Sequence, residues 1–235
     1  MTEVLKTAHS ATVRAWVEGW VISRNAPSPV REPWGLRVDV GLPGHVARHV
    51  VAAPTPETLH HLTATLTTPG TWLKLCAPPE AVAPLLPPRW AVQDPEFMMT
   101  APLTRAATTA ATTVAPAAVT SAGSAAAAGA PSGYTLAVTT RSGVTAVRLL
   151  TAAGEVAARG QYAVAGRTAV VDQVETAGNH RRRGLGTVVM RTIAAGAASM
   201  GARTGVLVAT AQGQALYETL GWTLHTPMTA AVLTS

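Results

Sequence analysis

Cysteine is nearly absent from the sequence, since Cys76 is the only one in 235 residues. A single thiol excludes an internal disulfide and a cysteine-based metal cluster. Seven histidines remain as candidate zinc ligands, above all the pair His45 and His49 and the neighbours His60 and His61. No cluster of cysteines or carboxylates accompanies these histidines in the sequence. We therefore expect surface histidines and no metal site.

Aromatic residues are also scarce, at 4% of the chain, although the formal net charge is +6 and the pI is about 10.4. A basic protein can bind nucleic acid, or it can bind a cofactor that carries several phosphates. Apart from the run Arg181–Arg183 the positive charge is dispersed, and no stripe of base-stacking side chains accompanies it. The composition therefore favours a phosphate-bearing small molecule over a nucleic-acid partner.

Long hydrophobic runs are missing as well. No apolar stretch approaches the roughly 18 residues that can span a bilayer, and the segment Met1–Lys6 lacks the apolar part of a signal peptide. We therefore expect a cytoplasmic protein with no membrane partner. The hydrophobic content of 48% and charged content of 13% are typical of a globular chain. Its length suits one large domain or two small ones.

Residues 104–132 consist almost entirely of Ala, Thr, Ser, Gly and Pro, and Arg105 is their only charge. Such a segment buries too little apolar surface to offset the entropy of ordering it. It predicts a flexible linker. The linker would separate an N-terminal α+β region, residues 1–103, from a C-terminal domain, residues 133–235.

Both regions show alternating strand and helix patterns. In the N-terminal region, apolar residues at helical spacing near the start predict an amphipathic helix; they are Val13, Trp16, Val17, Trp20 and Val21. We expect strands over 34–40, 45–53 and 72–76, helices over 55–67 and 79–86, and extended chain over 90–99. Residues 25–33 are expected to be a proline-broken loop.

The C-terminal region begins with four β-type runs at hairpin spacing, which predict an antiparallel meander. These runs cover 134–140, 144–150, 156–165 and 168–176. A helix over 185–200, a strand over 204–210, a helix over 212–220 and final strands over 222–233 follow. The sequence therefore predicts an α/β (α+β) chain.

The loop Asn179–Gly186 lies between a predicted strand and a predicted helix. Amides in the first turn of a helix lack intrahelical partners, and the helix dipole there favours an anion. Gly184 and Gly186 allow close backbone approach to a ligand, and three arginines add positive charge. This combination indicates a cradle for a phosphate or diphosphate.

The loop reads Arg181-x-x-Gly184-x-Gly186, and residues 215–222 read Ala-Leu-Tyr-Glu-Thr-Leu-Gly-Trp. These two motifs, in this order, resemble the acetyl-CoA signature and the later tyrosine element of the GNAT superfamily of N-acetyltransferases. The resemblance covers about residues 134–235. It implies a mixed, mostly antiparallel sheet that is flanked by helices and whose strands splay apart in the middle. It also implies acetyl-CoA as the cofactor, with the pantetheine arm lying between the splayed strands.

The resemblance also implies roles for individual residues. Tyr217 matches the tyrosine that often acts as general acid. Asp172 is our candidate for the base or amine anchor. Glu175 is the second choice, because side chains alternate along a strand. This period of two places Glu175 on the face opposite Asp172, Val174 and Thr176. The residues expected to bind the cofactor are Val174, Glu175, Thr176, Arg181, Arg182, Arg183, Gly184, Leu185, Gly186, Thr187, Thr210, Gly213 and Tyr217.

We therefore expect an enzyme that transfers acetyl from acetyl-CoA to a primary amine by direct attack, with a small-molecule amine as acceptor. A homodimer is also compatible with the sequence. Two alternatives stay open: a CoA-binding regulatory module without turnover, and a basic nucleic-acid-binding protein. Residues 1–103 are either a degenerate copy of the same half-fold or an unrelated α+β cap. Strand 71–76 and the helix after it parallel strand 204–209 and the helix that follows that strand.

Overall fold

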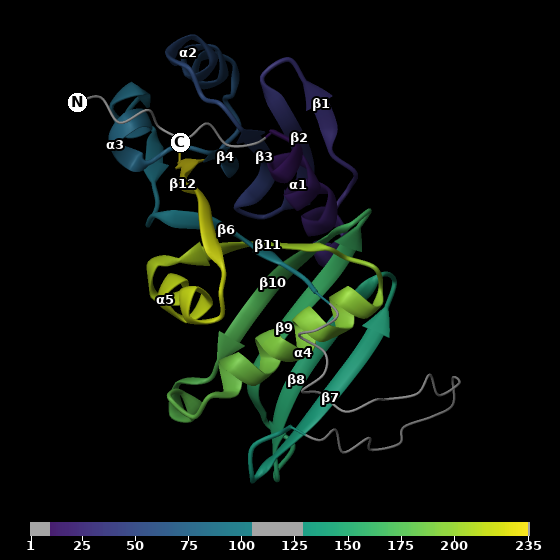
Figure 1. Ribbon diagram of the computed structural model, residues 1–235. Coiled ribbons are helices and arrows are strands. Elements are labelled where there is room, and N and C mark those ends of the chain that lie inside the picture. The colour runs from purple at the N-terminus through teal and green to yellow at the C-terminus, as the bar shows by residue number, and fades with distance from the viewer. Residues whose placement is uncertain (1–9, 105–128, 235) are drawn as a thin grey trace, which may run out of the picture. The chain divides into compact units, whose positions relative to one another are not determined.

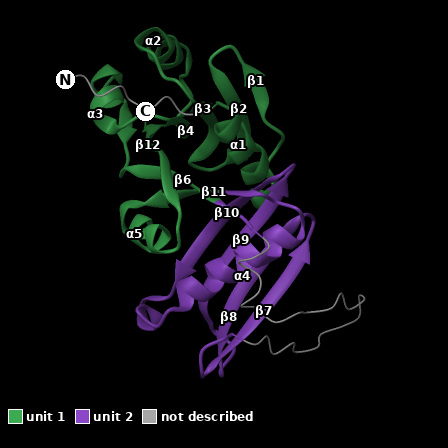
Figure 2. Ribbon diagram, viewed as in Figure 1, with its two compact units in different colours: residues 1–101, 206–235 green, residues 102–205 purple. Residues whose placement is uncertain are grey.

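The computed structural model describes residues 10–104 and 129–234, and the chain forms two compact units (Figures 1 and 2). The first unit contains residues 1–101 and 206–235, and the second contains residues 102–205. This division differs from the expected domains 1–103 and 133–235. Residues 206–235 group with the N-terminal region because strand β12 (Thr223–Leu233) pairs with strands of that region. Residues 105–128 of the expected linker lie outside the described residues.

The sheet of the first unit has the order β1-β2-β3-β4-β12-β6-β11, and β5 also pairs with β12. The strands β3 and β4 are parallel, whereas β12 is antiparallel to β4, β5 and β6. The bounds of the strands are β1 Val30–Glu32, β2 Gly35–Leu42, β3 His45–Val51, β4 Thr71–Leu75, β5 Trp90–Val92, β6 Glu96–Pro102 and β11 Thr204–Thr210.

The described part of the first unit contains four α-helices, α1 Ser10–Arg24, α2 Pro56–Thr65, α3 Pro79–Val82 and α5 Ala211–Thr219, and a 3₁₀ turn, Ala83–Leu85, follows α3. The prediction for α1 is confirmed, since all five of its helically spaced apolar residues are buried. Helix α2 begins where the sequence predicts it, because the Thr55 hydroxyl accepts a hydrogen bond from the amide of Thr58 and Pro56 stands at the first position.

The core of this unit lies between α2 and the sheet. Leu59 and Leu62 of α2 pack with Leu73 and Leu75 of β4, and Trp90 joins the same cluster. Each fully buried leucine stabilises the fold by about 2 kcal/mol. The strand β1 was missed, because three residues at a sheet edge carry no periodic signal and the segment reads as a proline-rich loop.

The second unit is the predicted meander. Its strands have the order β10-β9-β8-β7, each antiparallel to the next, with bounds β7 Tyr134–Arg141, β8 Val144–Thr151, β9 Val156–Ala165 and β10 Thr168–Thr176. Helix α4 (Leu185–Ser199) covers one face of this sheet (Figure 1). Gly160 of β9 permits the close approach of α4 to the sheet, since a Cβ at this position would lie 2.8 Å from Cγ1 of Val189 on α4.

The predicted fold class is therefore confirmed: the chain is a mixed α/β protein with mostly antiparallel strands and flanking helices. No helix in the described part of the chain is both long and apolar enough to cross a membrane.

Candidate functional site

Strand β10 carries a bulge at its centre. Asp172 pairs with Gln161 of β9 and Glu175 pairs with Arg159, so β10 advances three residues while β9 advances two. Gln173 has a φ of +54° at this point, a conformation that is uncommon for a residue other than glycine. The extra residue interrupts the alternation of side chains along the strand.

The bulge overturns one prediction. Directly paired residues of an antiparallel ladder share a face, and Gln161 and Arg159 are two apart on β9, so Asp172 and Glu175 lie on the same face. Val174 lies on the other face, because its Cγ2 is within 3.2 Å of the position of a Gly160 Cβ, beside α4. The expectation that Glu175 faces away from Asp172 was wrong, because a period of two does not hold across a bulge.

Both carboxylates have partners in the described structure. The Asp172 Oδ1 accepts a hydrogen bond of 2.9 Å from the amide of Gln173, which stabilises the bulge. The Glu175 Oε2 accepts bonds of 3.1 and 2.8 Å from Nε and Nη2 of Arg159. Both side chains of that ion pair are more than half exposed, so the pair adds at most about 1 kcal/mol. Glu175 is therefore only loosely held.

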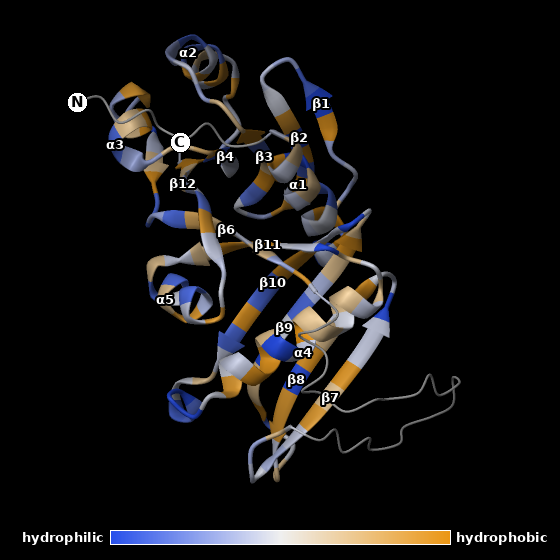
Figure 3. Cartoon of the chain, in the orientation of Figure 1, coloured by the Kyte–Doolittle hydropathy of each residue, from blue (hydrophilic) through white to orange (hydrophobic). Residues whose placement is uncertain are grey.

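The loop between β10 and α4 is hydrophilic (Figure 3) and begins with the 3₁₀ turn Gly178–His180. Helix α4 starts after Gly184, whose left-handed φ of +74° fits glycine and which offers no side chain to cap the helix. The amides of Leu185, Gly186 and Thr187 form the first turn. An uncapped first turn of this kind is suited to an anion.

The arginines of the loop differ in how they are held. The Nη1 and Nη2 atoms of Arg183 donate to the Tyr134 hydroxyl and to the Asn179 carbonyl, both at 3.0 Å. Arg181 donates through Nε to the Thr176 carbonyl at 3.4 Å. Arg182 takes a φ of +61°. All three side chains are exposed and keep further N–H groups for a ligand.

Tyr134 is a residue that the sequence analysis missed. Its hydroxyl lies 2.9 Å from Nδ1 of His180, and the two rings meet edge to face with centroids 5.6 Å apart. The first residue of β7 is thereby joined to the loop through both His180 and Arg183. No local sequence signal marks this contact, since Tyr134 and Arg183 are 49 positions apart.

The remaining predicted residues lie in the first unit. The Thr210 hydroxyl caps α5 by accepting a bond of 3.2 Å from the amide of Gly213. A Cβ on Gly213 would lie 3.2 Å from Cε2 of Tyr217, so glycine leaves room for that ring. Tyr217 is 8% exposed, and its ring centroid lies 6.2 Å from that of Trp222. Within this unit, Thr210, Gly213 and Tyr217 therefore lie close together.

Among the described residues, His49 contradicts the prediction that the histidines lie at the surface. His49 is only 4% exposed, and burial together with the Arg37 charge lowers its pKa to about 4, so it is not a surface histidine. His45 stacks on Trp72 with ring centroids 4.9 Å apart. In the ranges 10–104 and 129–234, no three residues of His, Cys, Asp or Glu gather in a way that could hold a metal ion.

Lys74 of the first unit is buried and pairs with Glu96, whose side chain is 25% exposed. The Lys74 Nζ lies 2.7 and 2.6 Å from the two carboxylate oxygens of Glu96, and the Lys74 side chain is 7% exposed. Burial lowers the pKa of Lys74, while the Glu96 charge acts in the opposite direction. No local sequence signal marks this pair, since its two residues are 22 positions apart.

Comparisons with known proteins agree with this geometry. Residues 153–229, which include the β10 bulge, the arginine loop and Tyr217, match the family described as FR47-like protein. A GCN5-related N-acetyltransferase from Kribbella flavida superposes with a TM-score of 0.61 at 17% identity, over 96% of this chain and 95% of that chain. The fold is that of the GCN5-related N-acetyltransferases. The GNAT resemblance predicted from the two motifs is thereby confirmed at the level of the fold.

A second GNAT structure gives the same result. An acetyltransferase of the GNAT family from Novosphingobium aromaticivorans superposes with a TM-score of 0.58 at 19% identity, over 97% of this chain and 99% of that chain. The GNAT fold thus extends over the N-terminal region as well as the part that carries the motifs. A comparison with curated protein sequences gives no match.

Proposed function

We propose that this protein transfers the acetyl group of acetyl-CoA to the primary amine of a small molecule by direct attack of the amine on the thioester. The GNAT fold and the match of residues 153–229 support a protein of the acyltransferase kind. Acetyl-CoA supplies the activated acyl group, and the residues of the chain bind it, orient the amine and move protons.

The observation that carries the proposal is the uncapped start of α4 after Gly184. The amides of Leu185, Gly186 and Thr187 would hold the diphosphate, because a helix start favours an anion. A Cβ at Gly184 would meet no protein atom within 4 Å, so the space over this turn is open to a ligand. The exposed guanidinium groups of Arg181, Arg182 and Arg183 would add charge-assisted bonds to the phosphates.

The β10 bulge suits the pantetheine arm. A bulge locally disrupts the ladder and bends the strand, and in β10 it falls between Asp172 and Glu175. The backbone from Val174 to Thr176 would then pair with the amides of the arm. Thr210 and Gly213 start α5 and would contact the cofactor through this helix start.

The reaction needs an unprotonated amine. An amine with a pKa of about 10.4 costs about 4.6 kcal/mol to deprotonate at pH 7. Asp172 is our first candidate to anchor the amine and accept its proton, and Glu175, which shares the strand face of Asp172, is the second. Tyr217 would donate a proton to the leaving thiolate, as the tyrosine element of the fold implies.

Two measurements test the proposal. Isothermal titration with acetyl-CoA should show binding, and a panel of amines should yield free thiol. In Tyr217→Phe we expect acetyl-CoA binding to remain while turnover falls by about 10²-fold. Binding without turnover on any amine would favour a regulatory CoA-binding module. No heat with acetyl-CoA, together with nucleic-acid binding that weakens steeply with salt, would favour the nucleic-acid alternative.

A further inference from the structure

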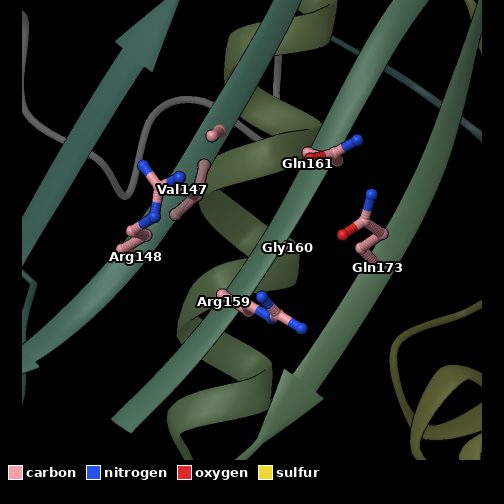
Figure 4. Close-up of a pocket in the computed structure, with 7 residues that line it drawn as sticks. Val147, Arg148, Arg159, Gly160, Gln161 and Gln173 are labelled. Atoms are coloured by element: carbon pink, nitrogen blue, oxygen red, sulfur yellow. The ribbon is translucent and has the colours of Figure 1, made fainter. Parts of the chain in front are cut away.

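The face of the meander that points away from α4 carries a polar hollow (Figure 4). Arg148 of β8, Arg159 and Gln161 of β9 and Gln173 of β10 surround it, and Gly160 forms part of its wall. Figure 4 shows these side chains on three neighbouring strands, with α4 behind the sheet. The hollow has a volume of about 60 Å³. A single water molecule needs a cavity of about 10–15 Å³, so the hollow is large enough for a carboxylate or a phosphate group.

The hollow contains an unfavourable arrangement of charge. Arg148 and Arg159 are directly paired across β8 and β9, and like charges directly opposite each other destabilise a sheet. Glu175 neutralises Arg159. In the described part of the chain, Arg148 has no carboxylate within 4.0 Å; its side chain donates to the Thr139 hydroxyl at 3.4 Å. Departures from such local rules are expected at functional sites.

The polar groups around the hollow are rich in donors. Two guanidinium groups offer five N–H groups each and two side-chain amides offer two each. The pairing of Glu175 with Arg159 uses one carboxylate oxygen, and Arg148, Arg159 and Glu175 together carry one net positive charge. Such a donor set complements an anion, and guanidinium geometry matches a carboxylate or a phosphate best.

The hollow adjoins the residues that we assign to the amine. Asp172 is paired with Gln161, which lines the hollow, and Gln173 of the bulge lines it as well. Adjacent strands are about 4.8 Å apart, so the backbones of β8 and β10 are separated by about 10 Å. One acceptor molecule can therefore place its amine at Asp172 and an anionic group at Arg148, if several bonds separate the two.

We propose that this hollow is an anion subsite for the acceptor, which is then a primary amine bearing a carboxylate or a phosphate. Arg148 binds the anion, Gln173 adds a neutral donor, and Arg159 contributes through the N–H groups that Glu175 does not use. The inference rests on the proposed acetyl transfer and adds the chemical class of the acceptor to it.

The experiment uses the full chain with acetyl-CoA and three probes of similar length: 5-aminopentanoate, 3-aminopropyl phosphate, and pentylamine, which lacks the anionic group. We expect the wild type to have a lower KM for at least one anionic probe than for pentylamine, and comparison of the two anionic probes separates carboxylate from phosphate. Arg148→Met keeps the aliphatic stem and should raise the KM for the preferred anionic probe about 10- to 100-fold. The kcat and the KM for pentylamine should stay within about twofold.

Arg141→Met is the matched control, since Arg141 is an exposed arginine at the end of β7; it should leave every KM unchanged. Equal KM values for the three probes in the wild type, or an equal loss for all three in Arg148→Met, would overturn the subsite. If acetyl-CoA binds and no amine is acetylated, the proposed function fails. Calorimetric titration of the CoA-loaded protein with the probes then decides the subsite: binding lost in Arg148→Met supports it, and no binding to the wild type overturns it.

Discussion

The Tyr134 hydroxyl accepts a hydrogen bond of 3.0 Å from Nη1 of Arg183. One aromatic side chain at the start of β7 thereby fixes an arginine of the loop that precedes α4. Because Arg183 also donates to the Asn179 carbonyl, its guanidinium group ties two parts of the loop together. The loop is held in shape before any ligand arrives, which lowers the entropic cost of binding.

This contact predicts the behaviour of Tyr134→Phe. The variant keeps the ring and loses the acceptor for Arg183, so the loop is less well ordered. We expect the Kd for acetyl-CoA to rise about 2- to 10-fold with little change in the unfolding temperature. Tyr162→Phe is the control, since the Tyr162 hydroxyl lies against Gly196 of α4 and donates to Met200. Equal effects of the two variants on the Kd would contradict the role of Tyr134.

Two glycines at opposite ends of α4 allow a matched comparison. Gly184 and Gly201 both have positive φ values, +74° and +91°, and a Cβ at either would meet no protein atom within 4 Å. Substitution of either glycine by alanine should therefore lower the free energy of unfolding of the protein by about 1–2 kcal/mol. Only Gly184→Ala places a methyl group beside the first-turn amides, so only this variant should lose acetyl-CoA affinity, by at least about tenfold. Calorimetry and thermal unfolding of both variants check this expectation.

His49 makes stability depend on pH. Its pKa falls from 6.5 to about 4 in the folded protein, so the unfolded chain binds a proton more readily. The contribution of His49 to the free energy of unfolding is fully present above pH 6.5 and is lost as the pH falls toward 4. The total loss from this group is about 3 kcal/mol.

In His49→Leu this part of the pH dependence should disappear, which urea unfolding at pH 7 and pH 5 measures. His61→Leu, at an exposed position of α2, should keep it. An unchanged pH dependence in His49→Leu would show that another group is responsible.

The pairing of the buried Lys74 with Glu96 predicts a large effect on stability. Glu96→Gln leaves the Lys74 ammonium group buried without its counter-charge, and removal of one partner from such a pair typically costs 3–5 kcal/mol. Glu18→Gln removes the exposed helical pair with Arg14 and should cost less than about 1 kcal/mol. Denaturant titration compares the two variants, and a similar small loss in both would refute the prediction.

The sequence predicted the elements of this fold well because their periodic signals are strong. The apolar residues of α1, the capped start of α2 and the glycine-punctuated strands of the meander all formed as expected. The bulge at Gln173 could not be predicted, since Asp172-Gln173-Val174-Glu175 contains no glycine or proline to mark it. The partners of Arg183 and of β12 are distant in the sequence, and local patterns carry no information about them.

The pairing of β12 with β4 sets an order for folding during synthesis. Thr229 bonds to the Ala77 carbonyl, and the two residues are 152 positions apart. At about 5–20 residues per second, the ribosome delivers β12 roughly 8–30 s after β4. Residues 102–205 are contiguous and can complete their own sheet while the first unit still lacks a central strand. A nascent chain in that interval leaves β4, β5 and β6 without their pairing to β12, and chaperones that bind unpaired strand edges should associate with it there.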